Sequence, residues 1–166
     1  MHRIKIHQGK VAALKVDAIV NPLVVNQQPI HQESINQQSL DTASQDQIRP
    51  ENFLIGDVRI VYASEDSPSA VIEVIGPLWR GGEYQEEEQL ASCYRKAMDM
   101  AKRENFRVIA FTPISGGAKG FPANRATKIA VQQVDSALRQ NPLMESVIFC
   151  CSDPVTTALY RTQVGR

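Results

Sequence analysis

The sequence lacks a net charge, a long apolar run and any cysteine spacing typical of a metal site. Its 18 lysines and arginines balance 18 aspartates and glutamates. Proteins that bind phosphate backbones carry an excess of basic residues, so nucleic acid is disfavoured as a partner. No run approaches the roughly 20 apolar residues that span a bilayer, so no membrane partner is expected. Cys93, Cys150 and Cys151 form no CxxC pair, which favours reduced thiols in a cytoplasmic protein, with no metal and no cofactor.

Nucleophilic and metal-binding arrangements are also missing. The histidines, His2, His7 and His31, show no ligand spacing and have no partner cysteine or acid nearby in the sequence. Cys93 falls on the apolar side of a predicted helix, which favours a packed core thiol. The sequence therefore predicts no catalytic residue from its own spacing.

What is present indicates one α/β domain over residues 1–166. Six runs rich in β-branched residues predict strands at 3–7, 17–20, 58–62, 70–75, 107–111 and 146–151. Apolar residues at spacings of three and four predict helices at 83–103, 122–140 and 155–163. Alternating strands and helices favour a layered domain with a largely parallel sheet.

One segment departs from this pattern. Residues 26–47 contain seven glutamines and few apolar anchors, and no glycine occurs from residue 10 to residue 55. Two interpretations stay open, a polar helix and a surface excursion.

Two stretches hold candidate ligand-binding residues. The run from Ile114 to Pro122, ISGGAKGFP, joins a predicted strand to a predicted helix. Its glycines allow backbone amides to approach an anion, although an ordinary glycine-rich turn is the alternative. Asp17 begins a buried strand, so its carboxylate either caps neighbouring amides or receives the amino group of a base.

Together these motifs resemble the macro domain family, which binds ADP-ribose. The resemblance rests on VDAIVN at 16–21, GPLWRGG at 76–82, LASCYR at 90–95 and FTPISGGAKGFP at 111–122. It implies a three-layer α/β/α sandwich with a mixed, mostly parallel sheet and a cleft for ADP-ribose or a similar nucleotide. The residues it implies for ligand binding are Asp17, Ala18, Asn21, Ser115, Gly116, Gly117, Ala118, Lys119, Gly120 and Phe121.

The departures from the family concern the other half of the cleft. An asparagine that orients the distal ribose in the hydrolases is replaced by Val24. The glycines of the first phosphate loop are missing, and the catalytic aspartate has only Gln32 or Glu33 near its place. Glu73 replaces a family histidine, and Ser152 replaces an aromatic residue near the adenine. The resemblance therefore implies a divergent member that has lost the usual hydrolase residues.

Three functions are compatible with this sequence. The first is a module that binds ADP-ribose or a related nucleotide weakly and does not turn it over. The second is a hydrolase of ADP-ribose derivatives with a reorganised acid–base set drawn from His31, Glu33 or Asp41. The third is a domain without ligand that binds a protein partner through residues 26–47. The first is the principal prediction.

Overall fold

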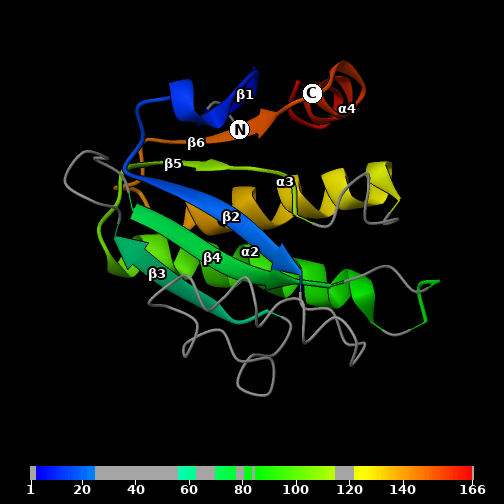
Figure 1. Ribbon diagram of the computed structural model, residues 1–166, viewed down its shortest axis with the longest axis horizontal. Coiled ribbons are helices and arrows are strands. Elements are labelled where there is room, and N and C mark those ends of the chain that lie inside the picture. Colours follow the sequence, from blue (N-terminus) through cyan, green and yellow to red (C-terminus); the bar gives the residue numbers. More distant parts are fainter. Residues whose placement is uncertain are drawn as a thin grey trace, which may run out of the picture.

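The computed structural model describes residues 3–24, 56–62, 70–77, 81–83, 85–114 and 122–165. These form a six-stranded sheet in the order β1-β6-β5-β2-β4-β3 (Figure 1). The strands are β1 (Ile4–Gln8), β2 (Ala18–Val24), β3 (Val58–Tyr62), β4 (Ala70–Gly76), β5 (Val108–Phe111) and β6 (Ser146–Cys151). All neighbouring pairs are parallel except β3 and β4. The predicted mixed, mostly parallel sheet is confirmed.

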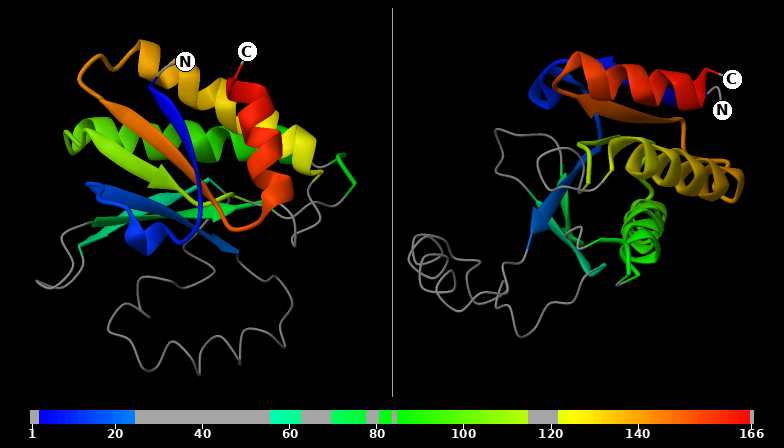
Figure 2. Two further views of the ribbon diagram at one scale, coloured as in Figure 1. Left: turned by 90° about the horizontal axis from the view of Figure 1, so that it is seen from above. Right: turned by 90° about the vertical axis from the view of Figure 1, so that its right-hand side faces the viewer.

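Three described helices lie side by side in the order α2 (Glu86–Arg103), α3 (Ala123–Arg139) and α4 (Pro154–Val164), and a 3-10 turn, η1 (Val11–Ala13), follows β1. Phe149 of β6 stacks on Tyr160 of α4 at 4.6 Å and meets Tyr94 of α2 at 6.4 Å, between ring centroids. Because one strand residue reaches both outer helices, the three helices cover the same face of the sheet (Figure 2). The prediction of a second helical layer falls on residues outside the described ones.

Strand β2 is longer than the sequence predicts. The run Asn21-Pro22 reads as its end, yet β2 pairs with β4 as far as Val24. Its pairing with β5 stops at Val20, so beyond that residue β2 has a ladder partner on one side only among the residues that the structure describes. Proline is tolerated at such an edge-like position because its missing N–H removes no ladder bond on the open side.

The helix ends follow their local sequences. Asp153 precedes α4, and its Oδ1 accepts a hydrogen bond from the Thr156 amide at 3.2 Å, which caps the start of this helix. At the end of α2, Asn105 adopts a left-handed conformation with φ 62°, and the Phe106 amide donates to the Ala101 carbonyl. No helix within these described stretches has both the length and the apolar character to cross a bilayer.

Candidate functional site

Five strands end at one edge of the sheet. Strands β1, β6, β5, β2 and β4 run parallel, so the segments that follow each of them leave from the same side. In open α/β sheets, ligands bind outside the carboxyl ends of the strands. This carboxyl edge is therefore the candidate site, and the opposite side is the amino edge.

The glycine-rich run leaves the carboxyl edge after β5. Its residues Ser115, Gly116, Gly117, Ala118, Lys119, Gly120 and Phe121 lie outside the described residues. The residues before the run are held firmly, because the amide and the hydroxyl of Thr112 both donate to the Val20 carbonyl at 3.2 Å. The Ile114 amide donates to the Tyr94 hydroxyl at 3.4 Å. The start of the run is therefore fixed to β2 and to α2.

Helix α3 begins directly after the same run. Pro122 occupies its N-cap position without a side-chain hydrogen bond, and its first turn contains no acidic residue. The first turn of α2 carries Glu86 to Glu88, and α4 is capped by Asp153. Of the three described helices, only α3 has no acidic residue at its own N-cap or first turn, although Glu87 of α2 pairs with its Arg125 at 3.1 Å, so its N-terminus is the best suited of the three to an external anion.

Asp17 lies at the amino edge instead. Its Oδ2 accepts hydrogen bonds from the Arg107 amide at 2.8 Å and the Val108 amide at 3.1 Å. Arg107 directly precedes β5 and Val108 begins it, whereas Ile114 follows the end of that strand. Asp17 therefore lies at the opposite end of β5 from Ile114, and its hydrogen bonds favour the capping interpretation. The base-binding interpretation gains no support from the described residues.

The next two predicted residues differ in exposure. Ala18 is fully buried in the core, so it supports β2 and offers no surface to a ligand. Asn21 is exposed and pairs in register with Glu73 of β4. Of the three predicted residues on this segment, only Asn21 lies on the part of β2 nearer the carboxyl edge.

An ion pair beside Asn21 was not anticipated. Glu73 accepts a hydrogen bond from Arg59 of β3 at 2.6 Å, with the two side chains 19% and 15% exposed. Glu73 and Asn21 are neighbours across β4 and β2, so the three polar residues form one row across three strands. Sequence reasoning noted Glu73 only as a departure from the family, because the partner depends on the register between β3 and β4.

The turn after β4 is held by a buried carboxylate. Glu86, at the start of α2, is 1% exposed, and its Oε2 accepts a hydrogen bond from the Gly82 amide at 3.0 Å. Gly81 and Gly82 have φ of 101° and 92°, a conformation that side chains disfavour. Sequence reasoning did not single out Glu86. Its position four residues after Gly82 is the signal that could have indicated this contact.

The described thiols are poor nucleophiles. Burial raises the pKa of Cys93 to about 12 and that of Cys151 to about 11, so both are protonated at neutral pH. Cys93 is fully buried, as its place on the apolar helix face predicts. No cluster of histidine, cysteine and acidic residues suitable for a metal occurs in the part of the chain that the structure describes.

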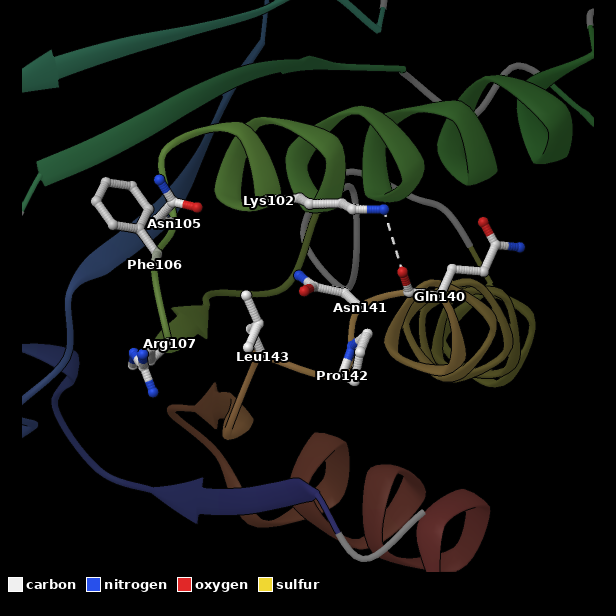
Figure 3. A pocket seen from close by; sticks show the side chains of 8 residues that line it. All are labelled: Lys102, Asn105, Phe106, Arg107, Gln140, Asn141, Pro142 and Leu143. Carbon is white, nitrogen blue, oxygen red and sulfur yellow. Dashed lines mark hydrogen bonds between the residues drawn. The ribbon is translucent and has the colours of Figure 1, made fainter.

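A cavity of about 420 Å³ lies at the other end of β5, among Lys102, Asn105, Phe106, Arg107, Gln140, Asn141, Pro142 and Leu143 (Figure 3). Lys102 reaches across it and donates to the Gln140 carbonyl at 3.1 Å. The ends of α2 and α3 border this cavity, and the negative ends of their dipoles disfavour an anion. The cavity contains none of the predicted ligand-binding residues and is separate from the carboxyl edge.

Comparison with known proteins agrees with this geometry. The sequence model described as "Macro domain" matches residues 30–130. A "Macro domain-containing protein" of Mesorhizobium japonicum is 38% identical over 111 residues, 67% of this chain and 63% of that relative. An "O-acetyl-ADP-ribose deacetylase" of Klebsiella pneumoniae is 43% identical over 107 residues, 64% of this chain and 61% of that relative. The chain thus spans a little over three fifths of these curated relatives.

Solved structures show the same fold. A macrodomain mutant from Oceanobacillus iheyensis superposes with a TM-score of 0.76 at 23% identity, over 96% of this chain and 89% of that one. A Trypanosoma brucei macrodomain in complex with ADP-ribose gives a TM-score of 0.71 at 24% identity, over 98% and 69% of the two chains. At such identities the likeness concerns the fold alone. The family model, however, matches well over half of the sequence. The chain belongs to the macro domain family.

Proposed function

We propose that this chain binds an ADP-ribose derivative at its carboxyl edge and hydrolyses an ester group on it. The second of the three functions predicted from the sequence is thereby preferred to the first. The observation that carries this preference is the 43% identity to a relative named O-acetyl-ADP-ribose deacetylase. Because the chain spans about 61% of that relative, activity on this substrate class is a proposal for this chain.

Binding would depend on the segment between β5 and α3. Backbone amides in a glycine-rich turn and at a helix N-terminus are suited to phosphate oxygens. Residues 115–121 supply the turn, and α3 supplies an N-terminus without an acidic residue in its first turn. We assign the diphosphate to this segment and the neighbouring part of the ligand to the end of β2 beyond Asn21. Asp17 and Ala18 are left out of the proposed site.

The proposed reaction is an ester hydrolysis. A base removes a proton from water, the water oxygen attacks the acetyl carbonyl, and the bond from the carbonyl carbon to the ribose oxygen breaks. The ribose oxygen takes up a proton, and acetate is released. His31, Glu33 and Asp41, the acid–base candidates predicted from the sequence, lie outside the described residues. Glu73 is engaged with Arg59, so it is not assigned as the base.

Two measurements test the proposal. Calorimetric titration with ADP-ribose measures binding, and chromatography measures acetate or ADP-ribose released from O-acetyl-ADP-ribose. A Gly117→Val variant should weaken binding at least tenfold because its Cβ atom obstructs the close backbone approach. Ser136→Val adds bulk at an exposed position of α3 and serves as the matched control. No heat with millimolar ADP-ribose and no product would refute the proposal.

Binding without turnover is the second candidate function. It is favoured by Val24 at the place of a polar residue of the hydrolases and by the missing glycines between residues 10 and 55. A side chain at every position restricts close backbone approach to a second phosphate face. Saturable heat on titration together with unchanged ester after prolonged incubation would favour this candidate over hydrolysis.

A further inference from the structure

The cavity between the ends of α2 and α3 contains a buried side-chain amide that is available to a ligand (Figure 3). Asn141 is 6% exposed, and its side chain makes no hydrogen bond with any residue that the structure describes. Figure 3 shows the amide group pointing into the cavity, beside Leu143. The amide therefore offers an acceptor oxygen and two donor hydrogens to a molecule that enters.

The main chain of Asn141 is held in place by three contacts. Its amide donates to the Leu138 carbonyl at 3.1 Å, and its carbonyl accepts the Met144 amide at 3.2 Å. Arg3, which precedes β1, donates to the Asn141 and Met144 carbonyls at 3.1 and 2.8 Å. None of these bonds uses the Asn141 side chain. The residue is thus positioned before a ligand binds, which lowers the cost of ordering it on binding.

The charged groups around the cavity favour an uncharged ligand. Lys102 donates to the Gln140 carbonyl at 3.1 Å, and Arg107 pairs with Glu145 at 3.5 Å. The carbonyl ends of α2 and α3 disfavour an anion between them, and the two cationic side chains disfavour a second cation. A neutral molecule meets neither penalty.

The other lining residues favour a flat ring with a polar edge. Leu143, which is 64% exposed, and Pro142 supply apolar surface. Asn105, which follows the end of α2, adds a second amide to the lining. An asparagine amide presents a donor and an acceptor side by side, and this pair matches the N6 amino group and the N7 atom of adenine. The volume of about 420 Å³ lies within the usual range for small-molecule sites, about 300–1,000 Å³.

We propose that this cavity is a second binding site, for an uncharged purine base or nucleoside of the adenine type. The Asn141 amide bonds the N6 and N7 edge of the base, and the face of the base lies against Leu143 and Pro142. The cavity includes Arg107, directly before β5, and therefore lies at the amino edge. The site is separate from the ADP-ribose site proposed at the carboxyl edge, and neither proposal depends on the other.

NMR titration of isotope-labelled protein with adenosine tests the proposal. We expect saturable shifts at residues 102–107 and 140–143, with a Kd below about 1 mM. Asn141→Leu keeps a similar side-chain volume and removes the amide, so it should raise this Kd about tenfold or more. The variant should stay folded, because the amide has no partner among the described residues. Gln132→Leu removes an exposed amide from the middle of α3 and is the matched control, with an unchanged Kd.

A second probe uses wild-type protein only. In N6,N6-dimethyladenosine the amino hydrogens are replaced by methyl groups, so the Asn141 oxygen has nothing to accept and binding should be about tenfold weaker. Equal binding of the two nucleosides, or an unchanged Kd in Asn141→Leu, would overturn the inference. No shift at the cavity residues with about 10 mM adenosine would also overturn it and would mean that the cavity holds water only. Failure to bind ADP-ribose would count against the carboxyl edge alone.

Discussion

Replacing Asp17 by alanine separates the two interpretations of this residue. Its Oδ2 joins the start of β2 to the start of β5 by accepting the amides of Arg107 and Val108 at 2.8 and 3.1 Å. The main-chain bonds of Asp17, to the Val108 carbonyl and from the Ala70 amide, do not involve the side chain and should remain. The substitution therefore removes only the carboxylate cap.

The expected effect is a moderate loss of stability. Hydrogen bonds from amides to a charged acceptor contribute about 1.5–3 kcal/mol each when buried. Asp17 is exposed, so water replaces part of this contribution. Helix N-caps are a comparable case, and their loss costs about 0.5–2 kcal/mol. We expect Asp17→Ala to lower the free energy of unfolding by about 1–2 kcal/mol. For a chain of this size, the melting temperature should fall by about 3–6 °C.

The assay combines urea denaturation, thermal melting and ADP-ribose titration on the same preparations. Glu145→Ala is the matched control, because it removes a carboxylate that pairs with Arg107 at 3.5 Å, with both side chains 61% exposed. Such a pair contributes about 0.5 kcal/mol or less. The capping interpretation requires lower stability and unchanged affinity in Asp17→Ala. Unchanged stability with a Kd raised more than about fivefold would refute it and favour contact with the base.

Two further predictions follow from described contacts. Asp153→Ala should lower the free energy of unfolding by about 1 kcal/mol, because the Thr156 amide at the start of α4 loses its acceptor; Asp153→Asn should recover most of the loss in urea titrations. Burial raises the pKa of Cys93 to about 12 from an ordinary value of 9.0, so the folded state favours the neutral thiol. Stability should therefore be full below pH 9 and fall as the pH rises towards 12, and a Cys93→Ala variant should show a shallower fall. A thiol reagent at pH 8 should modify Cys93 only at the rate of unfolding.

The sequence predicted the strands because β-branched alternation is a local property. Each of the six predicted runs overlaps an observed strand, and β3 and β6 have the predicted bounds. The error at β2 had a tertiary cause. Asn21-Pro22 reads as a turn on its own, and only the absence of β5 beyond Val20 makes a proline acceptable there.

Site residues were harder to predict because they depend on pairing and on direction. Arg59 and Glu73 are fourteen positions apart in sequence and meet only through the antiparallel register of β3 and β4. Tyr94 falls on an apolar helix stripe, and the stripe does not distinguish a packed ring from a hydroxyl that holds Ile114. The order of the family motifs likewise grouped Asp17 with the glycine-rich run. A residue that precedes a parallel strand, however, lies at the opposite edge of the sheet from the residues that follow such a strand.

The two edges of the sheet are held in different ways, and this difference bears on function. At the amino edge, the described bond that joins β2 to β5 comes from an exposed carboxylate, Asp17. At the carboxyl edge, the exits from β4 and β5 are held by groups about 1% exposed, Glu86 and Tyr94. Buried polar groups are costly unless they are hydrogen-bonded, so the bonds that Glu86 and Tyr94 make are part of what holds these segments in place. A site that binds its ligand through backbone amides needs these amides to be oriented before the ligand binds. Rigid segments after the strands provide such preorganisation. The bonds of Glu86 and Tyr94 therefore agree with the proposed site at the carboxyl edge.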